Sequence, residues 1–279
     1  MAQNTKPANQ ATIEHWAKRA QYWIKWSEHL APGDDEFTRR MFAAINLRAG
    51  HELLDLASGP GEPALKAAAE VGPDGLVVAT DIVPDMILGL RDRKGSAQFA
   101  NLHYAAADMQ FLPFPVARFD RVTCRFGIMF VEDPVLAFSE MRRVLRPGGR
   151  AVLMFWGPRE DTPIFYLNQA VAVEVLGLTE PNADRANRFG ATGSITDAMK
   201  QAGLIDVVEL EHRVVKREPD GKPFWRPYFE MTFGPQLIEQ EPNIMQRVDR
   251  VMLRHLEPYR IGDEYHLSAH MRLAVGIAE

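Results

Sequence analysis

The chain has 279 residues, of which 46% are hydrophobic and 25% charged, and its formal net charge is −5 at pH 7. This is the ordinary composition of a soluble globular protein, with room for one large domain or two small ones. The single cysteine, Cys124, excludes an internal disulfide and a metal site built from several cysteines, and the lack of a basic stripe argues against a nucleic-acid substrate.

The N-terminal residues are polar and lead into an amphipathic segment, so neither a secretory signal nor a membrane span is predicted. We therefore expect a cytoplasmic protein. Apolar residues recur at helical spacing from Ile13 to Leu30 and predict a first helix, which a turn at 31–34 ends. A second helix is predicted over 36–47, and residues 1–47 together are expected to form an N-terminal helical cap.

Strands and helices alternate between residues 51 and 155. The predicted strands are Glu52–Leu56, Leu76–Asp81, Leu102–Ala106, Phe119–Cys124 and Arg150–Phe155. Helices are predicted over 63–71 and 134–145, the first with a proline in its first turn and Gly72 just past its end. This alternation predicts an α/β fold with a doubly wound, parallel sheet.

The alternation lapses after residue 158. A mixed helical region (161–203), a strand (207–215), an aromatic-rich insertion (222–262) and a final strand (267–277) follow. We predict a single domain over 1–279, in which 48–158 form the core and 159–203 and 218–262 are insertions. The aromatic run 224–229 suggests a lid over an apolar or aromatic substrate, while a dimer contact or local packing would explain it equally well.

The densest signal is the segment 53–62, in which an apolar strand runs into a turn containing Gly59 and Gly61 and then into a helix. Glycine lets the backbone approach a ligand closely, and the helix N-terminus offers unpaired amide donors. By itself this turn can be a mere tight connection. Asp81 ends the second strand and Asp108 follows the third, so both carboxylates lie with the loop at the carboxyl ends of strands, where open α/β sheets bind ligands.

A dinucleotide-dependent oxidoreductase is the rival interpretation. Residues 59–64 fit the G-x-G-x-x-G/A pattern, and Asp81 is suitably placed to bind a ribose. Asp55 argues against it, because a carboxylate inside an apolar strand needs a partner that the dinucleotide scheme does not provide.

The core resembles that of the class I S-adenosylmethionine-dependent methyltransferases, close to the ubiquinone/menaquinone-biosynthesis family (methyltransferase type 11 domain). The motifs that carry the resemblance are 54–61 (LDLASGPG), 79–81 (ATD), 107–114 (ADMQFLPF) and 144–150 (VLRPGGR). The resemblance covers residues 51–158 and implies a Rossmann-like sheet of seven strands. The last strand is expected to be antiparallel and inserted between the fifth and the sixth.

The resemblance also implies S-adenosyl-L-methionine as the cofactor. The residues that it assigns to cofactor binding are Asp55, Ala57, Ser58, Gly59, Pro60, Gly61, Asp81, Ile82, Ala107, Asp108, Met109 and Arg125. In such enzymes the glycine loop holds the methionine part, with Asp55 near its ammonium group. Asp81 would accept hydrogen bonds from the ribose, and Asp108 would bind the adenine amino group with Met109 against the ring. Ala57 departs from the family pattern, in which many relatives have glycine.

No catalytic residue is assigned. Trp156 and Phe126, at strand ends, could attract a sulfonium by a cation–π interaction or could be ordinary core residues. Candidates for a general base are His15, Tyr22, His29, His255 and Tyr259, although such side chains are more often structural or exposed.

Two further features are assigned structural roles. Cys124 could act as a nucleophile of the cytosine-5 methyltransferase kind, but a buried cysteine more often behaves as a small hydrophobe. The basic residues Arg142, Arg143 and Arg146 are expected to complement the dipole at a helix end rather than to bind phosphate.

The sequence therefore predicts metal-independent methyl transfer to a small, apolar or aromatic molecule at an oxygen or carbon atom. An oxidoreductase and a catalytically silent cofactor-binding partner protein are the alternatives. A homodimer is compatible with the aromatic insertion, and no nucleic-acid or membrane partner is expected.

Overall fold

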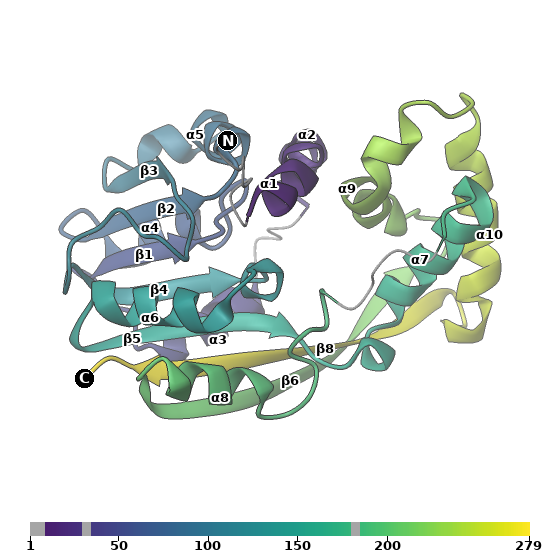
Figure 1. Ribbon diagram of the computed structural model, residues 1–279. Coiled ribbons are helices and arrows are strands. Elements are labelled where there is room, and N and C mark those ends of the chain that lie inside the picture. The colour runs from purple at the N-terminus through teal and green to yellow at the C-terminus, as the bar shows by residue number, and fades with distance from the viewer. Residues whose placement is uncertain (1–8, 30–34, 180–184) are drawn as a thin grey trace, which may run out of the picture. The chain divides into compact units, whose positions relative to one another are not determined.

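The computed structural model describes residues 9–29, 35–179 and 185–279, so the turn predicted at 31–34 lies outside the described residues. The chain divides into two compact units (Figure 1). Unit 1 comprises Met1–Phe155, Gly193–Leu210 and Leu273–Glu279, and unit 2 comprises Trp156–Thr192 and Glu211–Arg272.

Unit 1 is built on a sheet with the strand order β3-β2-β1-β4-β5-β8-β6. The strands are β1 (Glu52–Leu56), β2 (Leu76–Asp81), β3 (Leu102–Ala106), β4 (Phe119–Arg125), β5 (Leu145–Trp156), β6 (Ile205–Pro219) and β8 (Glu264–Ile277). β1 to β5 pair in parallel. At the start of β5 and the end of β8, the Gly148 amide donates to the Ala278 carbonyl (2.8 Å) and the Ala278 amide to the Gly149 carbonyl (2.9 Å), so β8 is antiparallel. The predicted fold class is thereby confirmed.

The first three strands have the predicted bounds, whereas β5 begins at Leu145 rather than at Arg150. The Pro147-Gly148-Gly149 run, which follows the predicted helix 134–145, lies within β5. The backbones of Gly148 and Gly149 hydrogen-bond to Ala278, just past the end of β8.

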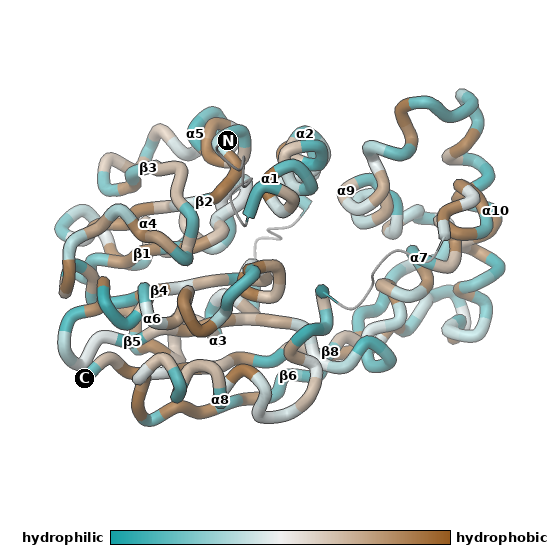
Figure 2. Tube along the Cα trace, viewed as in Figure 1, coloured by the Kyte–Doolittle hydropathy of each residue, from teal (hydrophilic) through white to brown (hydrophobic). Residues whose placement is uncertain are grey.

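Helices cover both faces of the sheet of unit 1 (Figure 1). They are α1 (Gln10–Ala17), α2 (Ala20–Lys25), α3 (Glu36–Ala44), α4 (Ala64–Val71), α5 (Pro84–Asp92), α6 (Pro134–Val144) and α8 (Ser194–Gln201), with short 3-10 turns η1 (Ser96–Gln98) and η2 (Ile128–Phe130). Buried side chains of α3, α4 and α5 share one apolar cluster with residues of β1, β2 and β5. In Figure 2 apolar and polar stretches alternate along these amphipathic helices.

The single helix predicted from Ile13 onward is two helices. The Arg19 amide bonds to the Trp16 carbonyl, three residues back (3.0 Å), and this tight turn closes α1 before α2 begins. Trp16 and Trp23, one on each helix, meet edge to face with ring centroids 5.6 Å apart. The break thus lets both indoles pack together.

Unit 2 contains three longer helices around its own apolar core. Its elements are η3 (Arg159–Asp161), α7 (Pro163–Leu176), α9 (Trp225–Leu237), α10 (Ile244–Leu256), η4 (Glu257–Tyr259), β7 (Arg260–Ile261) and parts of β6 and β8. Trp225 and Phe229, from the aromatic run, are 3% and 0% exposed and belong to this core. These two aromatics therefore serve local packing.

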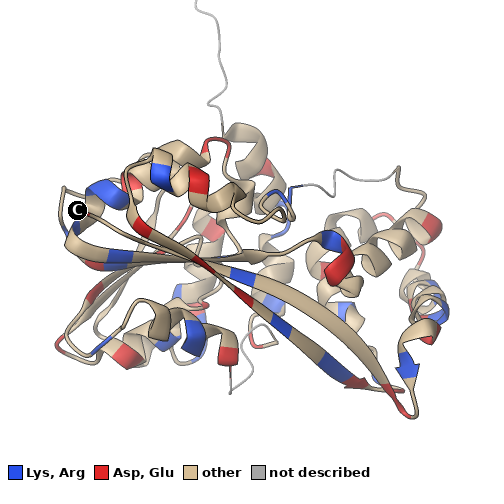
Figure 3. Cartoon of the chain, turned by 90° about the horizontal axis from the view of Figure 1, so that it is seen from below, with Lys and Arg blue, Asp and Glu red and all other residues tan. Residues whose placement is uncertain are grey.

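No helix among the described residues is long and apolar enough to cross a membrane. Acidic and basic residues are interspersed along the chain (Figure 3), in line with the charge pattern of the sequence.

Candidate functional site

The loop after β1 has a backbone that mostly suits glycine. Gly59 and Gly61 have φ of +50° and +121°, and Ala57 also lies in the left-handed region at +52°. A Cβ on Gly61 would come within 2.5 Å of Leu90 Cδ1, whereas one on Gly59 would meet nothing within 4 Å. The positive φ and the nearby Leu90 side chain of α5 both favour glycine at position 61, and the backbone at Gly59 faces open space that a ligand can enter.

Hydrogen bonds hold this loop between β1 and β2. The Ser58 hydroxyl donates to the Asp55 carbonyl (3.1 Å) and accepts from the Thr80 amide (3.1 Å). The Thr80 hydroxyl donates to the same Asp55 carbonyl at 2.9 Å. Ser58 and Thr80 are both 1% exposed, so this bracing is shielded from water.

Asp55 carries a buried carboxylate of which only one oxygen has a hydrogen-bond partner. Its side chain is 0% exposed, and Oδ1 accepts a 2.6 Å hydrogen bond from the Thr123 hydroxyl. Oδ2 is buried and has no partner among the described residues. Burial raises the pKa of Asp55 to about 7, against the lowering effect of the hydrogen bond from Thr123. The orphaned oxygen is a place where a cationic donor from a ligand would be stabilised.

Asp81, at the end of β2, shapes the same edge. Its Oδ2 accepts from the Gly59 amide (3.0 Å) and its Oδ1 from the Val83 amide (2.9 Å). Burial raises the pKa of Asp81 to about 6, although these backbone donors act to lower it. Each oxygen retains an acceptor position for a further donor, such as a sugar hydroxyl.

The segment after β3 brings Asp108 to this edge. The Ala107 amide bonds to the Asp81 carbonyl (2.9 Å), which ties the segment to the end of β2. Asp108 Oδ1 accepts from the Gln110 amide at 2.9 Å, and Oδ2 accepts from the carboxamide of Asn9, at the start of α1. The structure thus joins the ends of β2 and β3 to the N-terminal segment.

Ala57 and Met109 approach each other around Gly127, which follows β4. A Cβ on Gly127 would lie 2.3 Å from the Ala57 Cβ and 3.7 Å from Met109 Cε. Only glycine fits there, so the loops after β1, β3 and β4 meet at one point. Ile82, just after β2, packs against a cluster that includes Val83.

Arg125 lies in a buried ion-pair network rather than over an open surface. Its Nη1 is 2.7 Å from Asp35 Oδ2, with side-chain exposures of 11% and 2%. Burial acts to raise the pKa of Asp35, but Arg125, Thr38 and Lys66 together hold it below its ordinary value. Arg125 therefore fixes the N-terminal end of α3, and a direct contact with a cofactor remains a prediction.

Glu62 and Arg93 extend this charged network to the glycine loop. Arg93 Nη1 donates to the Pro60 carbonyl (3.1 Å) and lies 3.4 Å from Glu62 Oε1. Lys66 Nζ is 3.7 Å from Glu62 Oε2. Burial raises the pKa of Glu62 against the influence of these cations.

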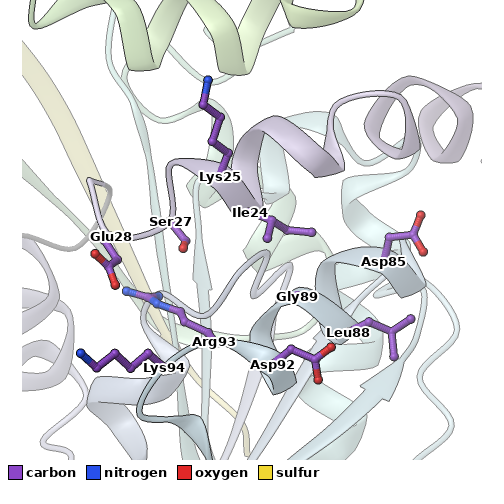
Figure 4. A pocket seen from close by; sticks show the side chains of 10 residues that line it. All are labelled: Ile24, Lys25, Ser27, Glu28, Asp85, Leu88, Gly89, Asp92, Arg93 and Lys94. Atoms are coloured by element: carbon purple, nitrogen blue, oxygen red, sulfur yellow. The ribbon is translucent and has the colours of Figure 1, made fainter.

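Arg93 also lines an open depression of about 580 Å³ between α2 and α5 (Figure 4). The residues that line it are Ile24, Lys25, Ser27, Glu28, Asp85, Leu88, Gly89, Asp92, Arg93 and Lys94. Its charges are mixed in sign, since Lys25, Arg93 and Lys94 face Glu28, Asp85 and Asp92.

The candidate bases on the N-terminal helices are at the surface. His15 and His29 are exposed and Tyr22 is half-buried. His15 packs edge to face on Trp16, with centroids 5.4 Å apart.

The candidates in unit 2 have structural partners. His255 Nε2 lies 3.3 Å from Glu174 Oε2, and the Tyr259 hydroxyl contacts that of Tyr166. Trp156 packs edge to face on Phe165 at 4.6 Å. Phe126, in unit 1, packs against the cluster of α3 and α4.

Cys124 has the expected structural role, whereas the basic cluster only partly follows the expectation: Arg142 and Arg143 lie in the last turn of α6, but Arg146 lies in β5 and pairs with Asp120 (2.8 Å). Cys124 is buried, and burial raises the pKa of its thiol to about 12, so the thiolate is scarcely populated. Arg143 lies in the last turn of α6, donates to the Leu112 and Phe114 carbonyls and pairs with Glu140.

Sequence reasoning missed Thr80, Thr123 and Asn9, all of which contact an expected site residue. The two threonines had a possible signal, since hydroxyl side chains interrupt otherwise apolar strands. It also missed His270 in unit 2, whose 2% exposed ring has Nδ1 2.8 Å from Asp161 Oδ2.

Residues 54–153 match the family model of a methyltransferase domain. This match agrees with the predicted class: residues 54–153 are similar to a methyltransferase domain, and they lie in a sheet of Rossmann-like order. The match covers the strands β1 to β5 that carry the site residues.

The ubiquinone/menaquinone biosynthesis C-methyltransferase UbiE of Saccharophagus degradans is 43% identical over 109 residues, which are 39% of this chain and 44% of that protein. The chain thus spans less than half the length of this curated relative. A putative methyltransferase from Bacillus halodurans has a TM-score of 0.56 at 19% identity, covering 87% of this chain and 99% of that one. The Haemonchus contortus phosphoethanolamine N-methyltransferase 2, in complex with S-adenosyl-L-methionine, has a TM-score of 0.57 at 19% identity, covering 97% and 58%. The expected cofactor agrees with these matches.

Proposed function

We propose that this chain binds S-adenosylmethionine at the loop after β1 and transfers its methyl group to a small apolar or aromatic molecule, at a carbon or oxygen atom. The observation that carries the proposal is the orphaned Oδ2 of Asp55, a buried anion beside a glycine loop that faces open space. A ligand with an ammonium group and ribose hydroxyls supplies partners for both Asp55 and Asp81. A nicotinamide dinucleotide carries no ammonium for Asp55.

In this proposal the residues at each strand end bind one part of the cofactor. Asp55 accepts a hydrogen bond from the ammonium group, and the Gly59 backbone lets the methionine part approach. Asp81 accepts from the ribose hydroxyls. Asp108 accepts from the adenine amino group, with Met109 against the ring.

When bound, the sulfonium supplies an activated methyl group, and methyl transfer from it needs an aligned acceptor and little water. The chain's contribution is therefore to orient and to exclude solvent. Trp16, Trp23 and Ile82 pack in one apolar cluster beside the Asp81 strand end and would keep water from it. No side chain is assigned as a base.

The acceptor class is supported by the curated relatives, which are named for C-methylation in ubiquinone and menaquinone biosynthesis. A quinone-like aromatic ring fits the aromatic or apolar acceptor expected from the sequence.

We infer that the chain is a single functional domain, in which 1–47 cap the cofactor and the insertions 159–203 and 218–262 select the acceptor. The role of the second insertion can be tested by mutation. Deleting residues 222–229 would remove Trp225 and Phe229 from the core of unit 2, so the single substitution Tyr228→Ala is the better test. It should raise the KM for the acceptor and leave cofactor affinity unchanged.

Calorimetric titration with S-adenosylhomocysteine, with NADH and NADPH in parallel, tests the cofactor. Micromolar binding of the first alone is expected, and binding of a dinucleotide would overturn the proposal. Asp81→Ala should weaken S-adenosylhomocysteine binding by about 1–3 kcal/mol, because ribose hydroxyls lose their acceptor. Transfer of labelled methyl to a panel of phenols and quinols then distinguishes an enzyme from a silent binding protein.

A further inference from the structure

Asn9 uses its side chain in an unexpected way. It occupies the N-cap position of α1, where asparagine ordinarily accepts a hydrogen bond from the helix backbone, yet no such capping bond is formed. The carboxamide instead donates to Asp108 Oδ2, 99 residues further along the chain, and the residue is 7% exposed. The side-chain hydrogen bond that Asn9 makes is therefore the one from Nδ2 to Asp108, and its Oδ1 does not cap α1.

Two further contacts place α1 along the same strand ends. The Thr12 hydroxyl donates to Glu132 Oε1 at 3.4 Å, in the loop after β4. Trp16 packs edge to face on Phe130, with centroids 4.9 Å apart. Asn9, Thr12 and Trp16 are spaced by three and four residues, so one face of α1 makes all these contacts.

The Asp108 carboxylate is held at both oxygens but not saturated. Oδ1 accepts from the Gln110 amide and Oδ2 from Asn9, and each oxygen can accept a second hydrogen bond. Two fixed donors restrict rotation of the carboxylate. An acceptor that is already oriented binds a donor with less loss of side-chain entropy than a free one.

We propose that Asn9 is a positioning residue for recognition of the adenine amino group: it orients Asp108 from the N-terminal helix and so gives the site its preference for a 6-amino purine. This inference rests on the proposed function. It assigns to α1 a part in purine selectivity as well as in covering the site.

The test compares S-adenosylhomocysteine with S-inosylhomocysteine, in which an oxo group replaces the amino group, by calorimetry on the full chain. The wild-type protein should prefer the amino ligand. Asn9→Ala should lower that preference roughly fivefold to tenfold, the effect of losing one ordinary hydrogen bond. Gln10→Ala is the matched control, because it removes only an exposed side-chain bond to Glu14 on the same helix (2.9 Å) and should leave the preference unchanged.

A double-mutant cycle separates positioning from a structural role. In an Asp108→Ala background, Asn9→Ala should no longer change the preference, since the group that it orients is gone. A merely structural role would weaken both ligands equally and leave the ratio intact, which would overturn the inference. Asn9→Asp keeps the volume but replaces the donor by a second carboxylate, so it should lower the preference at least as much as alanine. A wild-type protein that binds neither ligand would overturn the proposed function itself, and that result differs from an unchanged ratio.

Discussion

Thr123 and Asp55 are direct neighbours across two parallel strands, and the threonine hydroxyl donates to one oxygen of the buried carboxylate while the other oxygen is left without a partner. Burial destabilises the ionised form of this carboxylate, and the pKa of Asp55 is therefore raised to about 7. A cationic ligand reverses the balance, because it favours the ionised form.

Cofactor binding should therefore release a proton near neutral pH. With the pKa of Asp55 at about 7 in the free protein, the S-adenosylhomocysteine affinity should be about tenfold weaker at pH 6 than at pH 8. Calorimetry in buffers of different ionisation enthalpy measures the released proton directly. An affinity that does not vary between pH 6 and pH 8 would contradict the role of Asp55.

The same carboxylate should destabilise the ligand-free protein. Its pKa in the folded state lies above the ordinary value of 3.8, so the wild-type protein loses stability as pH rises from about 4 to about 7. Asp55→Asn has no such loss, and its free energy of unfolding at pH 8 should exceed that of wild type by about 2 kcal/mol. The difference should shrink below pH 5, and urea denaturation at both pH values measures it.

Asp120→Asn is a control for which the expected change in folding stability at high pH has the opposite sign. Burial acts to raise the pKa of Asp120, but the Glu52 amide and the ion pair with Arg146 at 2.8 Å lower it below the ordinary value. Such a group adds stability above its unfolded-state pKa and loses it as pH falls. Asp120→Asn should therefore reduce stability at pH 8, where Asp55→Asn increases it.

Gly61→Ala should mainly lower folding stability, whereas Gly59→Ala should mainly lower ligand affinity. At Gly61 the new methyl meets Leu90 Cδ1 at 2.5 Å and φ is +121°, so a loss of more than about 2 kcal/mol in folding stability is expected. At Gly59 the space is open and φ is +50°, so the stability loss should be about 1 kcal/mol. The ligand-facing methyl of Gly59→Ala should instead weaken S-adenosylhomocysteine binding at least tenfold, as a loss of roughly 1.4 kcal/mol. Thermal unfolding measures the stability of both variants, and calorimetry measures their affinity for S-adenosylhomocysteine. Equal losses of stability and of affinity in the two variants would refute the prediction.

Cys124 should be inert in the folded protein. Its thiol is buried with a pKa of about 12, so a disulfide reagent should label it only as fast as the protein unfolds. Cys124→Ala should retain methyl transfer. Rapid labelling in native buffer, or loss of transfer in a folded variant, would restore the nucleophile hypothesis.

The sequence predicted the sheet well because its signals are local. Apolar runs bounded by turn residues define β1, β2 and β3 to the residue, and the resemblance implied the antiparallel last strand between the fifth and the sixth. The start of β5 was missed because a Pro-Gly-Gly run has the composition of a turn, whereas its strand character comes from pairing with β4 at Leu145 and with Ala278, just past β8.

The site was predicted less completely, since its supporting contacts join distant segments. The pairing of Asp55 with Thr123 depends on the register of β1 against β4, which no local pattern specifies. Asn9 gave no signal either, because it precedes the segment 13–30 in which the first helix was predicted. Its bond to Asp108 exists only through the tertiary fold.

The position of β8 between β5 and β6 bears on how the protein is made. During synthesis both neighbours leave the ribosome before the strand that joins them. Until β8 emerges, each presents an unpaired edge that can recruit another nascent chain. Cells that express this protein faster than chaperones can shield those edges should accumulate it as aggregates, even though the finished molecule pairs both edges with β8.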